Sequence, residues 1–157
     1  MRSLAAAVGA VAAISLLVPG AAMPGAVAAQ STPKAQFAKQ MNSLCAKAHA
    51  SISSLPAAKT MAQAASVGAK VDTSEQSLIS QLEKLKPPAA LKPHVSRYIS
   101  VLKSQLALNN AVVSAAKNKN TAAFQKAANA ANYQNQSEQA ATTYEASVIG
   151  APACANA

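Results

Sequence analysis

The chain has 157 residues and a formal net charge of +9, with 14 lysines and arginines against 5 acids. This excess favours an anionic partner, or else a solvated basic surface that keeps the protein soluble. With three tyrosines, two phenylalanines and no tryptophan spread along the chain, we see no aromatic platform of the kind that single-stranded nucleic acid needs, and we expect no nucleic-acid partner.

Residues 1–29 read as a signal peptide. A positive start is followed by an uncharged apolar run over Leu4–Val18, and small residues then lead to a cleavage site after Ala28 or Ala29. The apolar run of about 15 residues is shorter than the roughly 20 that a retained membrane anchor needs. We therefore expect a secreted, extracytoplasmic protein whose single domain covers residues 30–157, with no membrane span in the mature chain.

The first predicted helix runs from Pro33 to Leu55, with Thr32 as its N-cap and Pro56 as its end. Apolar residues recur at spacings of three and four, which places them on one helical face. They are Phe37, Met41, Leu44, Ala48, Ile52 and Leu55. Since Pro56 can also open the next helix, we expect a tight connection.

Cys45 lies beside this apolar face, and Cys154 is the only other cysteine. Export favours a disulfide between Cys45 and Cys154, with two free thiols or a bridge between chains as the alternatives. Cys45 and His49 also have the spacing of a metal-binding pair, but two ligands are too few for a structural zinc site. If the disulfide forms, the end of the last helix must lie level with Cys45, and residues 34–44 must project past it or pack on the C-terminal tail.

The second predicted helix covers residues 57–86. Gly68 and the stretch 72–74 are weak helix formers, and Thr73 with Gln76 has the spacing of a capping box. One continuous helix is favoured over two helices separated near residues 68–73. Its expected inner face is Met61, Ala65, Gly68, Val71, Leu78, Leu82 and Leu85.

Two prolines, Pro87 and Pro88, end the second helix. The third begins between Pro88 and Pro93 and runs to about Lys117. Its expected inner face is Leu91, Val95, Tyr98, Leu102, Leu106 and Val113.

The fourth predicted helix covers residues 121–149 and ends at Gly150. Its expected inner face is Phe124, Ala127, Ala131, Ala141, Tyr144 and Val148, with a polar interruption at Gln134, Asn135 and Ser137.

Four amphipathic helices with short connections predict an all-α fold, an up-down-up-down four-helix bundle. Alanines outnumber all the Leu, Ile, Val, Met, Phe and Tyr residues of the mature chain together. Because alanine buries little apolar area, we expect a thin core with closely approaching helices.

The sequence offers no catalytic set. The five acids are Asp72, Glu75, Glu83, Glu138 and Glu145, and we expect them to be solvated surface groups. Glu138 and Glu145, seven residues apart, share a helical face. No nucleophile stands with a matching histidine and acid, and neither a covalent haem motif nor a glycine-rich phosphate loop is present. We therefore predict a protein that is not an enzyme and has no catalytic residues, metal site or cofactor.

An early Cys45, the Leu85-Lys86-Pro87-Pro88 break and the Gly150…Cys154 tail together show a likeness. The arrangement resembles small, uncharacterised secreted helical-bundle proteins of actinobacteria. That resemblance implies a bundle with the two cysteines paired, and it implies no activity.

Two functions follow as hypotheses. The first is an exported, non-enzymatic binding or envelope-associated protein whose basic faces contact anionic envelope polymer or lipid headgroups. The alternative is a carrier of a small apolar ligand, haem or a lipid, held between the helices where Gln134 and Asn135 interrupt the fourth one.

Overall fold

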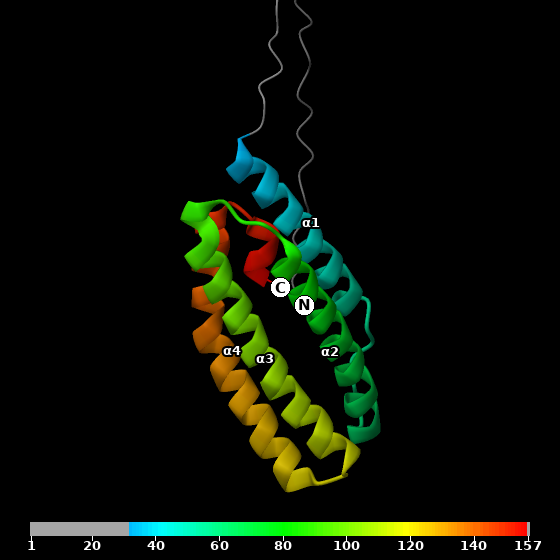
Figure 1. The fold of residues 1–157 in the computed structure, drawn as a ribbon. Coiled ribbons are helices and arrows are strands. Elements are labelled where there is room, and N and C mark those ends of the chain that lie inside the picture. The colour runs from blue at the N-terminus through cyan, green and yellow to red at the C-terminus, as the bar shows by residue number, and fades with distance from the viewer. Residues whose placement is uncertain (1–31, 157) are drawn as a thin grey trace, which may run out of the picture. The chain divides into compact units, whose positions relative to one another are not determined.

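A computed structural model describes residues 32–156, which fold as an all-α helical bundle, as predicted (Figure 1). The predicted signal peptide, residues 1–29, lies outside the described residues. The described elements are α1 (Pro33–Ser53), α2 (Met61–Lys84), η1 (Ala89–Leu91), α3 (Lys92–Lys117), α4 (Thr121–Ile149) and η2 (Pro152–Asn156), where η marks a 3₁₀ helix. In Figure 1, α3 and α4 run antiparallel on either side of the turn that joins them. No helix among residues 32–156 is both long and apolar enough to span a membrane.

The connection between α1 and α2 is longer than predicted. Helix α1 ends at Ser53, and α2 begins only at Met61. The reason is the N-cap at Thr60, whose hydroxyl accepts a hydrogen bond from the Gln63 amide at 3.2 Å. The Gln63 side chain in turn accepts one from the amide of Lys59, the residue before the cap, at 2.8 Å. This local signal sets the start of α2, so the prediction of a tight turn at Pro56 was wrong.

Helix α2 is continuous through residues 68–73, as favoured from the sequence. Thr73 does not restart a helix, because its hydroxyl donates to the Ala69 carbonyl one turn earlier. Gly68 serves packing instead: a Cβ at this position would clash with the Val113 side chain of α3. The missing side chain therefore lets α2 and α3 approach closely, as the alanine-rich composition predicts.

The ends of α4 match the sequence prediction. Asn120 caps its start by accepting a hydrogen bond from the Ala123 amide at 3.0 Å. Gly150 ends it in the left-handed conformation, with φ of 84°, where a side chain would be strained. After this turn the chain folds back as η2, which carries Cys154.

The inner face of α4 is not the predicted one. Beyond Ala131, the buried positions are Thr142, Glu145, Ala146 and Ile149, and Glu138 is half-buried. Asn135 follows the same helical period but is exposed, as are Ala141 and Tyr144, which is 58% exposed. Three helical turns take about 10.8 residues, so the eleventh residue after Ala131, Thr142, returns to its face, whereas Ala141 does not. The prediction placed Ala141 and Tyr144 on the inner face because it gave apolar residue type more weight than the helical period. The inner face of the C-terminal half of α4 was therefore predicted wrongly.

The large-residue core lies at one end of the bundle, around the two cysteines. Cys45 and Cys154 form a disulfide with a Cα–Cα distance of 5.1 Å, and both are fully buried. Beside them the fully buried Tyr98 donates a hydrogen bond from its hydroxyl to the Cys154 carbonyl at 3.0 Å. The apolar side chains packed around this group come from all four helices, from η1 and from the residue that joins α4 to η2. They are Phe37, Met41, Leu78, Ile79, Leu82, Leu91, Val95, Leu102, Ala146, Ile149 and Ala151.

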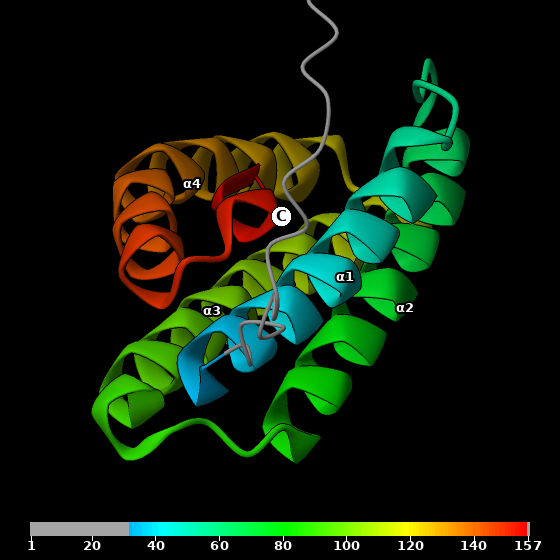
Figure 2. The same cartoon turned by 90° about the horizontal axis from the view of Figure 1, so that it is seen from above.

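The C-terminal tail packs on α1, as the disulfide geometry required. The Asn42 side chain accepts a hydrogen bond from the Ala153 amide at 2.9 Å and donates one to the Gly150 carbonyl at 3.4 Å. Figure 2 shows η2 lying between α1 and α4. The main neighbours of α1 are therefore α2 and η2, and the tail takes part in closing the bundle.

Candidate functional site

The acids of this chain turn inward, against the expectation from the sequence. Asp72 and Glu145 are only 6% and 5% exposed, and Glu75 and Glu138 are partly buried. Among the acids only Glu83 is exposed, and it pairs with Lys103 at 2.7 Å. The prediction of solvated surface acids was wrong because the acids sit at core positions of the helical period, where small neighbouring residues leave them room.

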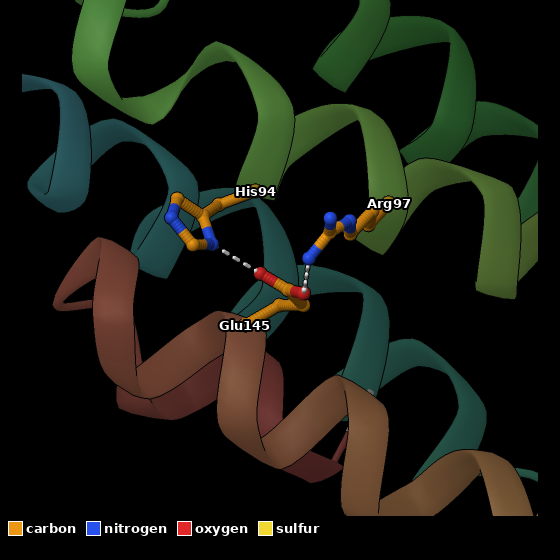
Figure 3. A network of polar contacts seen from close by, with 3 residues as sticks. All are labelled: His94, Arg97 and Glu145. Atoms are coloured by element: carbon orange, nitrogen blue, oxygen red, sulfur yellow. Dashed lines mark hydrogen bonds and ion pairs between the residues drawn. The ribbon is translucent and has the colours of Figure 1, made fainter.

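Glu145 ties α4 to α3 near the disulfide (Figure 3). His94 lies in the first turn of α3, and its Nδ1 is 2.6 Å from Glu145 Oε2. Arg97, one turn further along, brings Nη1 to 3.8 Å from Glu145 Oε1. The buried carboxylate thus faces two basic side chains, which compensates its loss of hydration.

The His94–Glu145 pair resembles half of a catalytic triad, but the described residues give it no nucleophile. No serine, threonine or cysteine side chain is hydrogen-bonded to His94 in the described part of the chain. Its ring instead lies 6.5 Å from the Tyr144 ring, in a tilted arrangement on the surface of the bundle. The network therefore links α3 to α4 through polar contacts.

A second carboxyl group, Glu75, lies where α2 faces α3. The Asn109 side chain donates to both Glu75 oxygens, at 3.1 and 3.2 Å. Burial raises the pKa of Glu75 to about 7; the Asn109 hydrogen bond opposes this rise and the nearby Asp72 adds to it. Burial also raises the pKa of Asp72, against the attraction of Lys117, and Asp72 Oδ1 has no hydrogen-bond partner. This region holds carboxyl groups that are poorly solvated and incompletely paired.

Glu75 and Asn109 open into a pocket of about 360 Å³ between α2, α3, α4 and η2. Almost all its lining side chains are polar and uncharged, and Glu75 is the one ionisable group among them. We call it the polar pocket, lined by Glu75, Gln105, Asn109, Asn132, Asn135, Gln136, Gln139, Thr142 and Ala155. It is the most distinctive chemical feature of the described chain, because hydrogen-bonding side chains converge there from three helices, α2, α3 and α4.

The residues considered for metal or haem are placed differently. Cys45 is bonded to Cys154, and His49 is exposed with Ser53 Oγ 3.4 Å from its Nδ1. Residues 32–156 contain no group of three or more His, Cys, Asp or Glu side chains arranged to hold a metal ion. The two residues that suggested a ligand site in the fourth helix are both exposed. Asn135 lines the polar pocket, and Gln134 lies outside it and bonds to Glu138 at 2.9 Å.

Sequence reasoning missed Glu75, Asn109, Gln139 and Thr142 as members of one site. The signal was present in α4, where counting at the helical period from Ala131 reaches Asn135 and Thr142 on the inner face. No protein-family model, curated protein or solved structure gives a significant match to this chain.

Proposed function

We propose that the protein is an exported, non-enzymatic binding protein whose basic surface contacts anionic polymer or lipid headgroups of the cell envelope. The observation that supports this is the separation of charge. Of the 14 lysines and arginines, all but Arg2 lie in the described chain, and every one of them is exposed. Because four of the five acids turn inward and Glu83 pairs with Lys103, the surface presents almost only positive charge to a partner.

Six of the 13 described lysines and arginines lie near the two ends of α3, and the other seven are spread over α1, the α1–α2 connection, α2 and α3. Lys84, Lys86 and Lys92 flank the connection between α2 and α3. Lys117, Lys119 and Lys126 flank the turn between α3 and α4. Each cluster sits where helix ends or a connecting segment meets solvent, so long lysine side chains can reach an extended polyanion or a headgroup layer.

Binding should be measured on vesicles with and without anionic phospholipid, and on a phosphodiester wall polymer, across a salt series. Raising the salt from about 0.01 M to about 1 M shortens the Debye length from about 30 Å to about 3 Å, so affinity should fall steeply. Binding that is absent at low salt, or that ignores salt, contradicts the proposal.

Two matched variants locate the contact. The triple replacement of Lys84, Lys86 and Lys92 by Gln removes three charges from one end, and the replacement of Lys117, Lys119 and Lys126 by Gln removes three from the other. Both proteins carry the same net charge. A stronger loss in one of them identifies the binding end, and equal losses indicate a contact spread over both.

A second groove supports a second candidate function, carriage of a small apolar ligand such as a lipid or haem. The groove measures about 500 Å³ and lies between the end of α2 and the start of α3. Its floor includes Leu82, Val95 and Ile99, and charged side chains, Glu83, Lys92 and Lys103, also line it. Native mass spectrometry of the protein purified from its own host tests this, and a protein that is consistently free of added mass argues against it.

A further inference from the structure

The polar pocket contains hydrogen-bonding capacity that the protein itself does not use. Six carboxamide side chains line it. The Asn109 amide is engaged with Glu75. The other five, which make no side-chain hydrogen bond to any described residue, are Gln105, Asn132, Asn135, Gln136 and Gln139. Since they come from two helices and face one concavity, they are available together to a molecule that enters it.

The lining excludes some ligands by its chemistry. No lysine, arginine or histidine contributes to it, so an anion would meet no positive charge. An apolar molecule would bury unpaired amides, which costs free energy for every group left without a partner. A protonated polyamine brings only donors, and it would leave the amide N–H groups unsatisfied while using Glu75 and the amide oxygens alone.

Hydroxyl groups fit this lining better. A carboxamide offers two N–H donors and an acceptor oxygen, whereas a hydroxyl offers one donor and two acceptor lone pairs. Adjacent hydroxyls on one ring can therefore engage both ends of neighbouring amides, and the Thr142 hydroxyl and the Glu75 carboxyl add further partners. The volume of about 360 Å³ equals that of about twelve water molecules at about 30 Å³ each, enough for one or two sugar rings.

We propose that the polar pocket binds a small, uncharged, polyhydroxylated ligand of the saccharide class, with Asn135, Gln139 and Gln105 as the central hydrogen-bonding residues. This site is separate from the basic surface. Binding of an uncharged sugar does not depend on ion pairing and should be insensitive to ionic strength, whereas contact with an anionic surface should weaken with salt. One function can therefore fail while the other holds.

The test is a titration of the oxidised protein with glucose, N-acetylglucosamine and trehalose, followed by ¹⁵N chemical shifts and by calorimetry. At least one sugar should bind saturably and shift the amide resonances of the pocket. The variant with both Asn135→Ala and Gln139→Ala should bind at least about tenfold more weakly, since two hydrogen-bonding side chains are lost. Both residues are exposed in the sugar-free protein, so the variant should keep its fold, which circular dichroism checks.

The matched control replaces an exposed asparagine of α3 and an exposed glutamine of α4 that do not line the pocket, by Asn110→Ala and Gln125→Ala. It should bind the sugar as the parent protein does. Glu75→Gln keeps the hydrogen-bonding shape without the charge, so it should change sugar affinity by less than about threefold. Putrescine serves as the cationic probe. The proposal is overturned if none of the three sugars binds, if the control loses affinity as much as the pocket variant, or if only putrescine binds and Glu75→Gln abolishes that binding.

Discussion

The two halves of this bundle are stabilised in different ways. In the half around the disulfide, large apolar side chains from α1, α2, α3 and α4 surround Cys45, Cys154 and the buried Tyr98. In the distal half, toward the turn between α3 and α4, the buried residues are small or polar. They are Ala65, Asp72, Val113, Ala115, Ala116, Ala131 and Thr142.

The difference shows how an alanine-rich chain divides its tasks. Large side chains and a covalent link concentrate stability at one end, where burial of each large apolar group contributes roughly 1.5–3 kcal/mol. The other end relies on close helix contact, as at Gly68 and Val113, and leaves room for polar groups. The polar pocket lies between the two, where Glu75, Asn109 and Thr142 replace what would otherwise be core.

Of the changes considered, removal of the disulfide should lower the free energy of unfolding most, because it weakens the half of the bundle that holds the large apolar core. Replacing both Cys45 and Cys154 by Ala opens a link between residues 109 positions apart, which should lower the free energy of unfolding by about 4–5 kcal/mol. Urea denaturation of the variant and the oxidised parent measures this. Hydrogen exchange should show that α1 and η2 lose protection first, because the tail holds α1 through Asn42 as well as through the disulfide. Equal stability of the two proteins would contradict a disulfide-centred half.

Close packing in the distal half is tested by Gly68→Ala. The added Cβ collides with Val113, and overpacking of about 1–3 kcal/mol should outweigh the roughly 1 kcal/mol that alanine gains in a helix interior. Thermal and urea unfolding should therefore show a net loss of up to about 2 kcal/mol.

The double variant supplies the control. In a Val113→Ala background the collision is gone, so Gly68→Ala should stabilise the protein by its helix propensity alone. The sign of the effect should reverse between the two backgrounds. An equal loss in both would show that helix contact at this point is not what Gly68 provides.

Helix boundaries and the disulfide could be predicted because they depend on local or strongly constrained signals. Asn120 and Gly150 are cap residues whose chemistry acts within one turn, and two cysteines leave only one intramolecular pairing. The start of α2 was misplaced because Pro56 was taken as the opening of the helix and the N-cap at Thr60 was overlooked. Thr60 satisfies a backbone donor of the first turn, which Pro56 cannot do.

The site could not be predicted in the same way, because it depends on which polar residues face inward. Hydrophobic periodicity finds the apolar face of a helix, and in the middle of α4 that face carries Asn135 and Thr142. The partnership of Glu75 with Asn109 joins residues 34 positions apart on different helices, and it depends on the register between α2 and α3. That register is set by contacts between the helices, such as the one between Gly68 and Val113. The hydrophobic pattern of a single helix carries no information about those contacts.

The smallest expected effect concerns the pH dependence that Glu75 gives to the stability of the protein. Its pKa of about 7 in the folded protein lies above the ordinary value of 4.5. Below about pH 4.5 the group is protonated in both states and contributes nothing. Between pH 4.5 and 7 the unfolded chain releases a proton that the folded chain retains, so stability should fall as the pH rises, and the loss should be complete above pH 7. For this partly exposed group we expect a total of about 1 kcal/mol.

Urea unfolding at a series of pH values measures this slope, and Glu75→Gln should flatten it while stabilising the protein at neutral pH. A residual slope of the same sign should remain from Asp72, whose pKa burial also raises. The matched control is Glu83→Gln, since Glu83 is the exposed acid of the same helix and pairs with Lys103 outside the pocket. It should leave the slope in place. If Glu75→Gln leaves the slope unchanged as well, the Glu75 carboxyl group is better solvated than its burial between α2 and α3 indicates. The pH dependence of the unfolding free energy would then come from another acid.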